Sequence, residues 1–128
     1  MNVKTFTTIL ERLFGVLLLF AGLNKVFLFF PLPEKTGFAL RFLDTLEATG
    51  YVMPIVTTTI LATGLALLSR RFVSLAAVCL FPVALNIFLF HLMHDRSGLA
   101  IAIVVLGGNL ALIFRRLPTY KNLLKGRD

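Results

Sequence analysis

The sequence predicts an all-α membrane protein, in which four transmembrane helices form a bundle and a short amphipathic helix occupies the first loop. Its 128 residues are 58% hydrophobic and only 15% charged, whereas a soluble domain is usually about 45–50% apolar and about 25% charged. The apolar residues are gathered into four long runs with short polar breaks between them. So little polar surface cannot cover a globule in water, and we therefore expect a single membrane domain with the bilayer as its main solvent.

The first predicted span covers about residues 10–30, which is long enough as a helix to cross the roughly 30 Å of bilayer hydrocarbon. The apolar run continues past Phe30 without the small-residue cleavage site that closes a signal peptide. We therefore expect this helix to be retained. The stretch "PLPEKTG" follows, and its two prolines and one glycine end the helix.

The first loop predicts a short amphipathic helix within residues 36–50. Its apolar side chains recur at helical spacing while its charged ones lie elsewhere on the helical wheel: Phe38, Phe42 or Leu43, and Leu46 against Arg41, Asp44 and Glu47. A helix of this kind either lies flat on the outer interface or folds over the bundle as a lid. The sequence leaves both arrangements open.

The remaining spans are predicted at about residues 51–69, 72–92 and 98–115, separated by the short polar breaks "SRRF" and "HDRSG". A basic tail over residues 116–128 follows the last span, and leucines and a tyrosine interleave its charges. Such a segment is typical of contact with anionic membrane lipids.

Small residues predict where the helices approach one another closely. Gly15 and Gly22 mark one side of the first span, Gly64 lies in the second, and Gly107–Gly108 lies in the fourth. Membrane helices pack through such positions because small side chains let the backbones come together. We interpret these glycines as packing features.

The distribution of lysine and arginine predicts the orientation. Nine lie on the side that holds both termini and four on the other: Lys4, Arg12, Arg70, Arg71, Arg115, Arg116, Lys121, Lys125 and Arg127 against Lys25, Lys35, Arg41 and Arg96. The side richer in basic residues normally faces the cytoplasm. We therefore expect a multi-pass protein of the inner (cytoplasmic) membrane with both termini inside. The basic residues form no continuous polar face, so the sequence does not indicate nucleic-acid binding.

Polar side chains from three predicted spans reach one level in the outer half of the bilayer. At a rise of about 1.5 Å per residue, their depths nearly coincide, with the histidine at the outer rim: Asn24, Lys25, Thr58, Asn86 and His91. Lys25 either snorkels to the interface or points inward to this set. The set is therefore either a group of ordinary interhelical hydrogen bonds or a small pocket for a lipid head group, a quinone carbonyl or an acidic partner.

A second polar set is expected near the cytoplasmic side, formed by Glu11, Arg12 and Asn109. Glu11 beside Arg12 is most simply an interfacial charge pair. Asn109 in the fourth span is most simply an interhelical hydrogen bond.

Motifs for independent catalysis do not stand out. His91, His94 and Asp95 share a short patch, but no second group of ligands accompanies them, so we expect no metal site. Cys79 is the single cysteine, which excludes an internal disulfide or a CxxC redox pair. No phosphate-binding loop, nucleophile elbow or pair of catalytic carboxylates is present. We therefore expect no intrinsic cofactor and no enzymatic activity from this chain alone.

The stretches "FAGLNKVFLFF", "GYVMP", "LLSRRF" and "LNIFLFHLMHD" follow one another in an order that resembles the DoxX family of small bacterial four-helix membrane proteins. The resemblance covers about residues 10–115. The family's arginine near the start of the first helix and its "G-l-x-K" near the end match Arg12 and Gly22 to Lys25. Its "N-x-x-x-F-H" pattern matches Asn86 and His91.

One position departs from that family. Many members carry a glutamate in the second helix four residues before a glycine that corresponds to Gly64, where this chain has Ile60. The absence of that carboxylate argues against a proton-coupled mechanism shared with those relatives.

The resemblance implies an accessory role. Family members include a small subunit linked to a quinone-dependent sulfur oxidoreductase, other membrane partners of redox or detoxification enzymes, and proteins similar to channel-assembly chaperones. We therefore expect an accessory subunit of a quinone-linked or other redox system that binds a small hydrophobic molecule or a partner. An assembly factor or lipid-binding protein without redox role is the alternative, and a small-molecule permease ranks last. Membrane lipids, another membrane protein or further copies of this chain are the expected partners.

Overall fold

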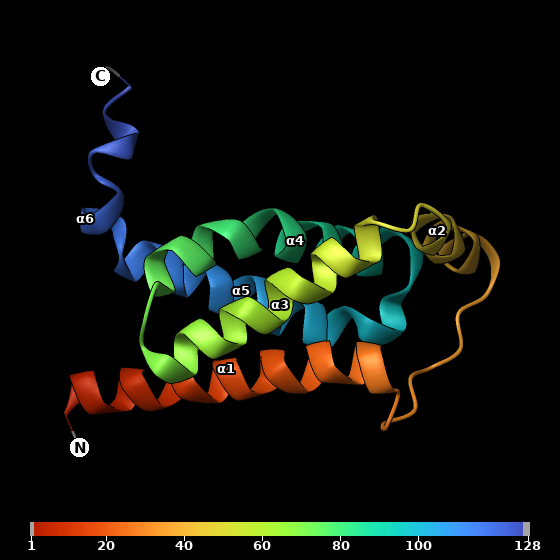
Figure 1. Ribbon diagram of the computed structural model, residues 1–128, viewed down its shortest axis with the longest axis horizontal. Helices are drawn as coiled ribbons and strands as arrows, with labels where there is room; N and C mark the ends of the chain where they lie inside the picture. The colour runs from red at the N-terminus through yellow and green to blue at the C-terminus, as the bar shows by residue number, and fades with distance from the viewer. Residues whose placement is uncertain (1, 127–128) are drawn as a thin grey trace.

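The computed structural model describes residues 2–126, and its regular structure over this range is entirely helical. Four long helices run back and forth side by side and form the bundle (Figure 1). Their bounds are α1 Val3–Phe27, α3 Val52–Ser69, α4 Val73–His94 and α5 Leu99–Arg115. Each is long and apolar enough to cross a bilayer, the last one counted together with the short turn before it. The predicted all-α class with four spans is therefore confirmed.

Shorter helices occupy the two ends of the bundle. They are α2 Gly37–Ala48, η1 Arg96–Gly98, α6 Leu117–Tyr120 and η2 Leu123–Lys125. Figure 1 shows the start of α1 and helix α6 at one end of the bundle and α2 at the other. We call these the termini end and the α2 end.

Helix α1 begins well before the first apolar run. The Asn2 side chain caps it, because its Oδ1 accepts a hydrogen bond from the Thr5 backbone N–H at 2.8 Å. The helix ends at Phe27, where Leu28 adopts a left-handed conformation with φ of 52°. At about 1.5 Å per residue, α1 is about 37 Å long, which exceeds the hydrocarbon thickness of about 30 Å. Its first turns therefore extend beyond the hydrocarbon, and Figure 1 shows them projecting past the turn between α3 and α4.

Helices α1 and α3 approach through glycines, as predicted. A Cβ added to Gly15 would lie 3.1 Å from the Gly64 carbonyl oxygen, and one added to Gly64 would lie 3.0 Å from the Gly15 carbonyl oxygen. Gly22 meets Leu61 in the same interface. At Gly107, by contrast, an added Cβ would meet nothing within 4 Å, so this glycine makes no close contact.

The four spans enclose a narrow apolar core. The Phe14 ring of α1 lies against Gly108 of α5, which brings the first and last spans into contact at this point. Ile60 lies fully inside at 3% exposure. The main core side chains are Phe14, Leu18, Ile60, Leu67, Val73, Ala77, Leu80, Ala84, Val105 and Leu112.

Helix α2 is viewed nearly down its axis in Figure 1, so it crosses the end of the bundle instead of extending it. Its ring of Phe42 stacks on Phe90 of α4 at 5.6 Å between centroids, and its Phe38 ring lies 4.3 Å from the His94 ring. Ala39 is buried beneath it. Helix α2 therefore packs across the end of the bundle.

The basic tail is anchored by one side chain. Tyr120 is buried, and its hydroxyl donates a hydrogen bond of 2.6 Å to the Ser74 carbonyl oxygen at the start of α4. The last residues of the expected tail, Arg127 and Asp128, lie outside the described residues.

Candidate functional site

Glu11 is the centre of a charge cluster at the termini end. It is 5% exposed, and its carboxylate accepts a two-pronged bond from Arg116, with Nη1–Oε1 at 2.9 Å and Nη2–Oε2 at 3.0 Å. Arg70, at the turn between α3 and α4, and Arg115, at the end of α5, bind the same carboxylate. One carboxylate thus meets three guanidiniums, and the cluster keeps two net positive charges.

The pair expected between Glu11 and Arg12 does not form. Neighbouring residues on a helix point about 100° apart, and Glu11 faces the bundle while Arg12 is exposed. Among the described residues, Arg12 pairs with no carboxylate. The sequence did contain a signal, because Glu11 and Asp128 are the two acidic residues on the predicted cytoplasmic side, and Glu11 alone of these lies within an expected helix.

Asn109 lies in the core one or two turns further in. It is fully buried, and its Nδ2 donates a hydrogen bond of 2.8 Å to the Ala77 carbonyl oxygen of α4. This is the interhelical bond that the sequence led us to expect. Its Oδ1 has no partner among the described residues.

Asn24, at the α2 end, closes the helix to which it belongs. It is 3% exposed, and its Oδ1 accepts a hydrogen bond of 2.8 Å from the Phe30 backbone N–H. Its carbonyl oxygen accepts another from the Leu28 N–H at 2.9 Å. Asn24 therefore satisfies backbone groups where α1 ends and the chain turns toward Pro31.

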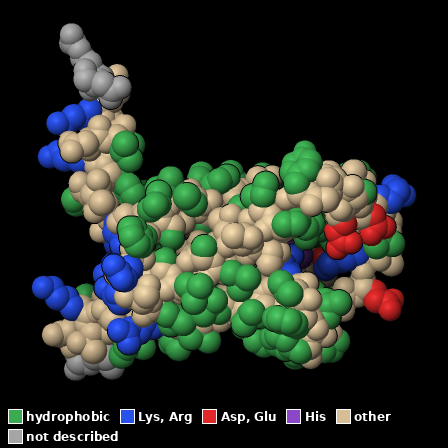
Figure 2. Space-filling model, viewed as in Figure 1, with side chains coloured by type: hydrophobic (Ala, Val, Ile, Leu, Met, Phe, Trp, Pro, Cys, Tyr) green, Lys and Arg blue, Asp and Glu red, His purple; other side chains and the backbone are tan. Residues whose placement is uncertain are grey.

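Lys25 is not part of the apolar core. It is exposed in the last turn of α1, and the Glu47 carboxylate of α2 and the Lys35 ammonium lie within electrostatic reach. A cation in the last turn also suits the negative end of the helix dipole. Figure 2 shows Lys and Arg side chains recessed at this end of the molecule, with Asp and Glu beside them.

Asn86 and Thr58 face outward from the bundle. Both are exposed, and the Asn86 Nδ2 donates to the Pro82 carbonyl oxygen of its own helix at 2.8 Å. Asn86 shares this outer side of α4 with Cys79 and Pro82, which are also exposed. Neither Asn86 nor Thr58 forms a hydrogen bond to Lys25 or Asn24 within the described part of the chain.

His91 belongs to a polar group that fastens the first loop. Its Nδ1 lies 3.0 Å from the Asp95 carbonyl oxygen and 3.3 Å from Asp95 Oδ2. Lys35 of the first loop forms an ion pair with the same carboxylate. The hydrogen bond from Lys35, assisted by those from Ser97, lowers the pKa of Asp95 to about 2. We call Lys35, His91, Asp95 and Ser97 the loop latch.

The five residues expected in one outer cluster do not form it. Asn24, Asn86 and His91 each bond to a different part of the chain instead. Residues 2–126 contain no group of three potential metal ligands. The loop latch escaped sequence reasoning because Lys35 and Asp95 are far apart in the chain, although the "HDRSG" break already placed Asp95 beside His91.

Comparisons of this chain with protein-family models, with curated proteins and with solved structures find no match. The four apolar helices establish a small multi-pass helical membrane protein.

Proposed function

We propose that this protein is an accessory membrane subunit that binds a transmembrane helix of a partner protein through the outward side of α4. The observation that carries the proposal is Asn86, a carboxamide that faces away from the bundle in the middle of a span. A polar side chain at such a depth is costly and usually serves a function.

The outward side of α4 offers unsatisfied polar groups at two points. The only hydrogen bond of the Asn86 carboxamide within the described residues runs to its own helix, which leaves an N–H and the Oδ1 available. Pro82 has no N–H, so it cannot make the usual helical bond to the Val78 carbonyl oxygen. A neighbouring helix with a polar side chain at this depth would satisfy these groups, at about 0.6 to 2 kcal/mol for each hydrogen bond.

Apolar side chains surround Asn86 on this side of α4. Val78, Leu89 and Met93 are all exposed and recur at helical spacing along it. They provide area for van der Waals packing, which drives association in lipid together with hydrogen bonds. The surface therefore has the composition of a helix-docking stripe, which we call the α4 stripe: Val78, Cys79, Pro82, Asn86, Leu89 and Met93.

The redox part of the proposal rests on the resemblance to the DoxX family. The four-span bundle agrees with that family, and a quinone-linked reaction would be carried out by the partner, with any quinone bound at the shared interface. An assembly factor for membrane proteins would use the same α4 stripe, so identifying the partner separates the two roles. We expect the protein to be located in the inner membrane, with both termini in the cytoplasm.

Photo-crosslinking in cells tests the docking role. A benzophenone amino acid at Leu89 is expected to yield a crosslink to a second membrane protein. Val16 is an exposed residue of α1 outside the α4 stripe, and the same group at this position is expected to yield no crosslink. Asn86→Leu is expected to reduce the Leu89 crosslink about fivefold, corresponding to about 1 kcal/mol. Thr58→Val is the matched control, because it removes an outward polar group from α3.

Three outcomes would contradict the proposal. The docking role fails if Leu89 and Val16 crosslink equally, or if Asn86→Leu leaves the crosslink unchanged. Crosslinks between copies of this chain alone would replace the accessory role with a homo-oligomer. A partner that is neither redox-linked nor isolated with quinone would remove the redox part and favour an assembly factor.

A further inference from the structure

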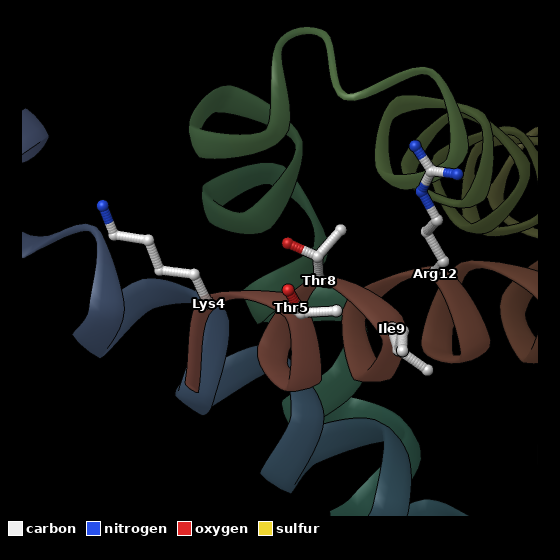
Figure 3. Close-up of a pocket in the computed structure, with 5 residues that line it drawn as sticks. All are labelled: Lys4, Thr5, Thr8, Ile9 and Arg12. Atoms are coloured by element: carbon white, nitrogen blue, oxygen red, sulfur yellow. The ribbon is translucent and has the colours of Figure 1, made fainter. Parts of the chain in front are cut away.

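We propose that a hollow on the first three turns of α1 binds the phosphate of an anionic phospholipid. The hollow measures about 380 Å³ and is lined by Lys4, Thr5, Thr8, Ile9 and Arg12. Figure 3 shows Lys4, Thr8 and Arg12 rising from one side of α1, with the Thr5 hydroxyl beside them. The spacing of four residues from Lys4 to Thr8 and from Thr8 to Arg12 aligns the three on one helix face.

The two cations of this hollow lack an acidic partner. Neither Lys4 nor Arg12 forms an ion pair within residues 2–126. The nearest acidic residue in sequence, Glu11, faces the bundle, where Arg70, Arg115 and Arg116 occupy both of its oxygens. The buried cluster therefore takes up the charge of Glu11 and leaves the hollow positive. Figure 2 agrees, since the described side chains on the visible face of the termini end include Lys and Arg but no Asp or Glu.

The hollow also holds two available hydroxyls. Thr7 donates to backbone carbonyls of its own helix, whereas the hydroxyls of Thr5 and Thr8 have no hydrogen-bond partner in the described part of the chain. Figure 3 shows the two hydroxyls between Lys4 and Arg12, with the Lys4 ammonium leaning away from Arg12. A phosphodiester accepts several hydrogen bonds from cationic and neutral donors, so Arg12 and the hydroxyls can bind it directly while Lys4 adds positive charge nearby.

The position of the hollow favours a lipid as the source of the phosphate. The first turns of α1 extend past the turn between α3 and α4 (Figure 1), which places them at head-group depth when α3 spans the hydrocarbon. From Ile9, an exposed apolar stripe runs along α1 toward the bilayer centre through Leu13, Val16 and Phe20. Acyl chains can lie on this stripe while the phosphate occupies the hollow, an arrangement that free phosphate cannot use.

Native mass spectrometry of the protein in nanodiscs tests the site. Discs of phosphatidylcholine are compared with discs that also contain phosphatidylglycerol, and retained lipid is counted. Wild type is expected to retain phosphatidylglycerol preferentially. Arg12→Gln is expected to weaken this retention about tenfold, as for loss of a charged hydrogen bond. Thr8→Val is expected to weaken it about threefold without any change in charge, while Thr8→Ser keeps the hydroxyl and the binding.

Arg71→Gln is the matched control. Arg71 is exposed in the turn between α3 and α4, so this variant also removes one charge from the termini end of the protein. It is expected to leave retention within about twofold of wild type. Arg12 and Arg71 are exposed and Thr8 is half-buried, and equal thermal unfolding of wild type and variants shows that the fold is kept.

Two results would overturn the inference. If Arg71→Gln weakens retention as much as Arg12→Gln and Thr8→Val has no effect, the protein attracts anionic lipid through surface charge alone. If millimolar inorganic phosphate displaces phosphatidylglycerol from wild type, the site binds soluble anions and the lipid assignment is wrong.

Discussion

At the scale of single residues, the Glu11 carboxylate joins parts of the chain that are far apart in sequence. It holds Arg70 from the turn between two spans and Arg115 and Arg116 from the end of the last span. Removing one partner of a buried ion pair costs about 3 to 5 kcal/mol, because the remaining charges stay without compensation. The cost here is at the low end, since two of the arginines are substantially exposed.

Glu11→Gln is expected to destabilise the protein by up to about 3 kcal/mol. The amide keeps the shape of the side chain but leaves three guanidiniums facing one another without a carboxylate. Thermal or denaturant unfolding in mild detergent measures the loss. Glu47→Gln serves as the control, because this exposed carboxylate should change stability by no more than about 0.5 kcal/mol. Equal losses in the two variants would show that Glu11 does not hold the cluster together.

At the scale of elements, polar contacts hold the first loop near its beginning and near its end. Asn24 fixes the beginning by accepting the Phe30 N–H, and the loop latch fixes the later part through Lys35 and Asp95. Helix α2 then packs through Phe42 on Phe90. The loop and α2 therefore form a fastened cover at the α2 end.

The loop latch is expected to open in acid. The pKa of Asp95 is lowered from 3.8 to about 2 in the folded protein, so the latch stabilises the fold fully above about pH 4 and is lost as the pH falls through about 2. Hydrogen exchange of residues 28–36 is expected to quicken between pH 5 and pH 2, after correction for the intrinsic pH dependence of exchange.

Asp95→Asn isolates this effect. It should speed exchange of the same segment at pH 5, because Lys35 and His91 lose the carboxylate that they share. Asp44→Asn, a change at an exposed residue of α2, should leave the exchange rates unaltered. An unchanged segment in Asp95→Asn would show that Asn24 and the α2 contacts hold the loop without the latch.

Sequence reasoning predicted the spans better than the contacts between polar residues. Long apolar runs identify transmembrane segments and helical periodicity identifies an amphipathic helix. The four spans and the helix in the first loop were therefore predictable. The start of α1 was not, because the Asn2 cap extends the helix through polar residues outside the apolar run. The depth calculated from sequence position placed Asn24 and Asn86 at one level in the bilayer. It could not show which way each side chain faces around its helix axis, and Asn86 faces outward while Asn24 faces inward.

At the scale of the whole molecule, charge separates the two ends of the bundle. Arginines and lysines gather at the termini end around a single buried carboxylate, while the acidic residues of the visible face lie at the α2 end (Figure 2). Cytoplasmic loops carry an excess of lysine and arginine in membrane proteins. The same end also carries the hollow proposed for an anionic lipid, and such lipids enrich the cytoplasmic leaflet.

We therefore expect the termini end to face the cytoplasm, and cysteine labelling in intact cells checks this. Cys79 is first replaced, as Cys79→Ala, to remove the native thiol. Thr36→Cys in the first loop should then react with a membrane-impermeant maleimide from outside, whereas Asn122→Cys in the tail should react only after lysis. Both positions are exposed in the fold, so access to the reagent depends on the side of the membrane. The opposite pattern would place the basic end outside, where the anionic-lipid site would lack the leaflet that best supplies its ligand.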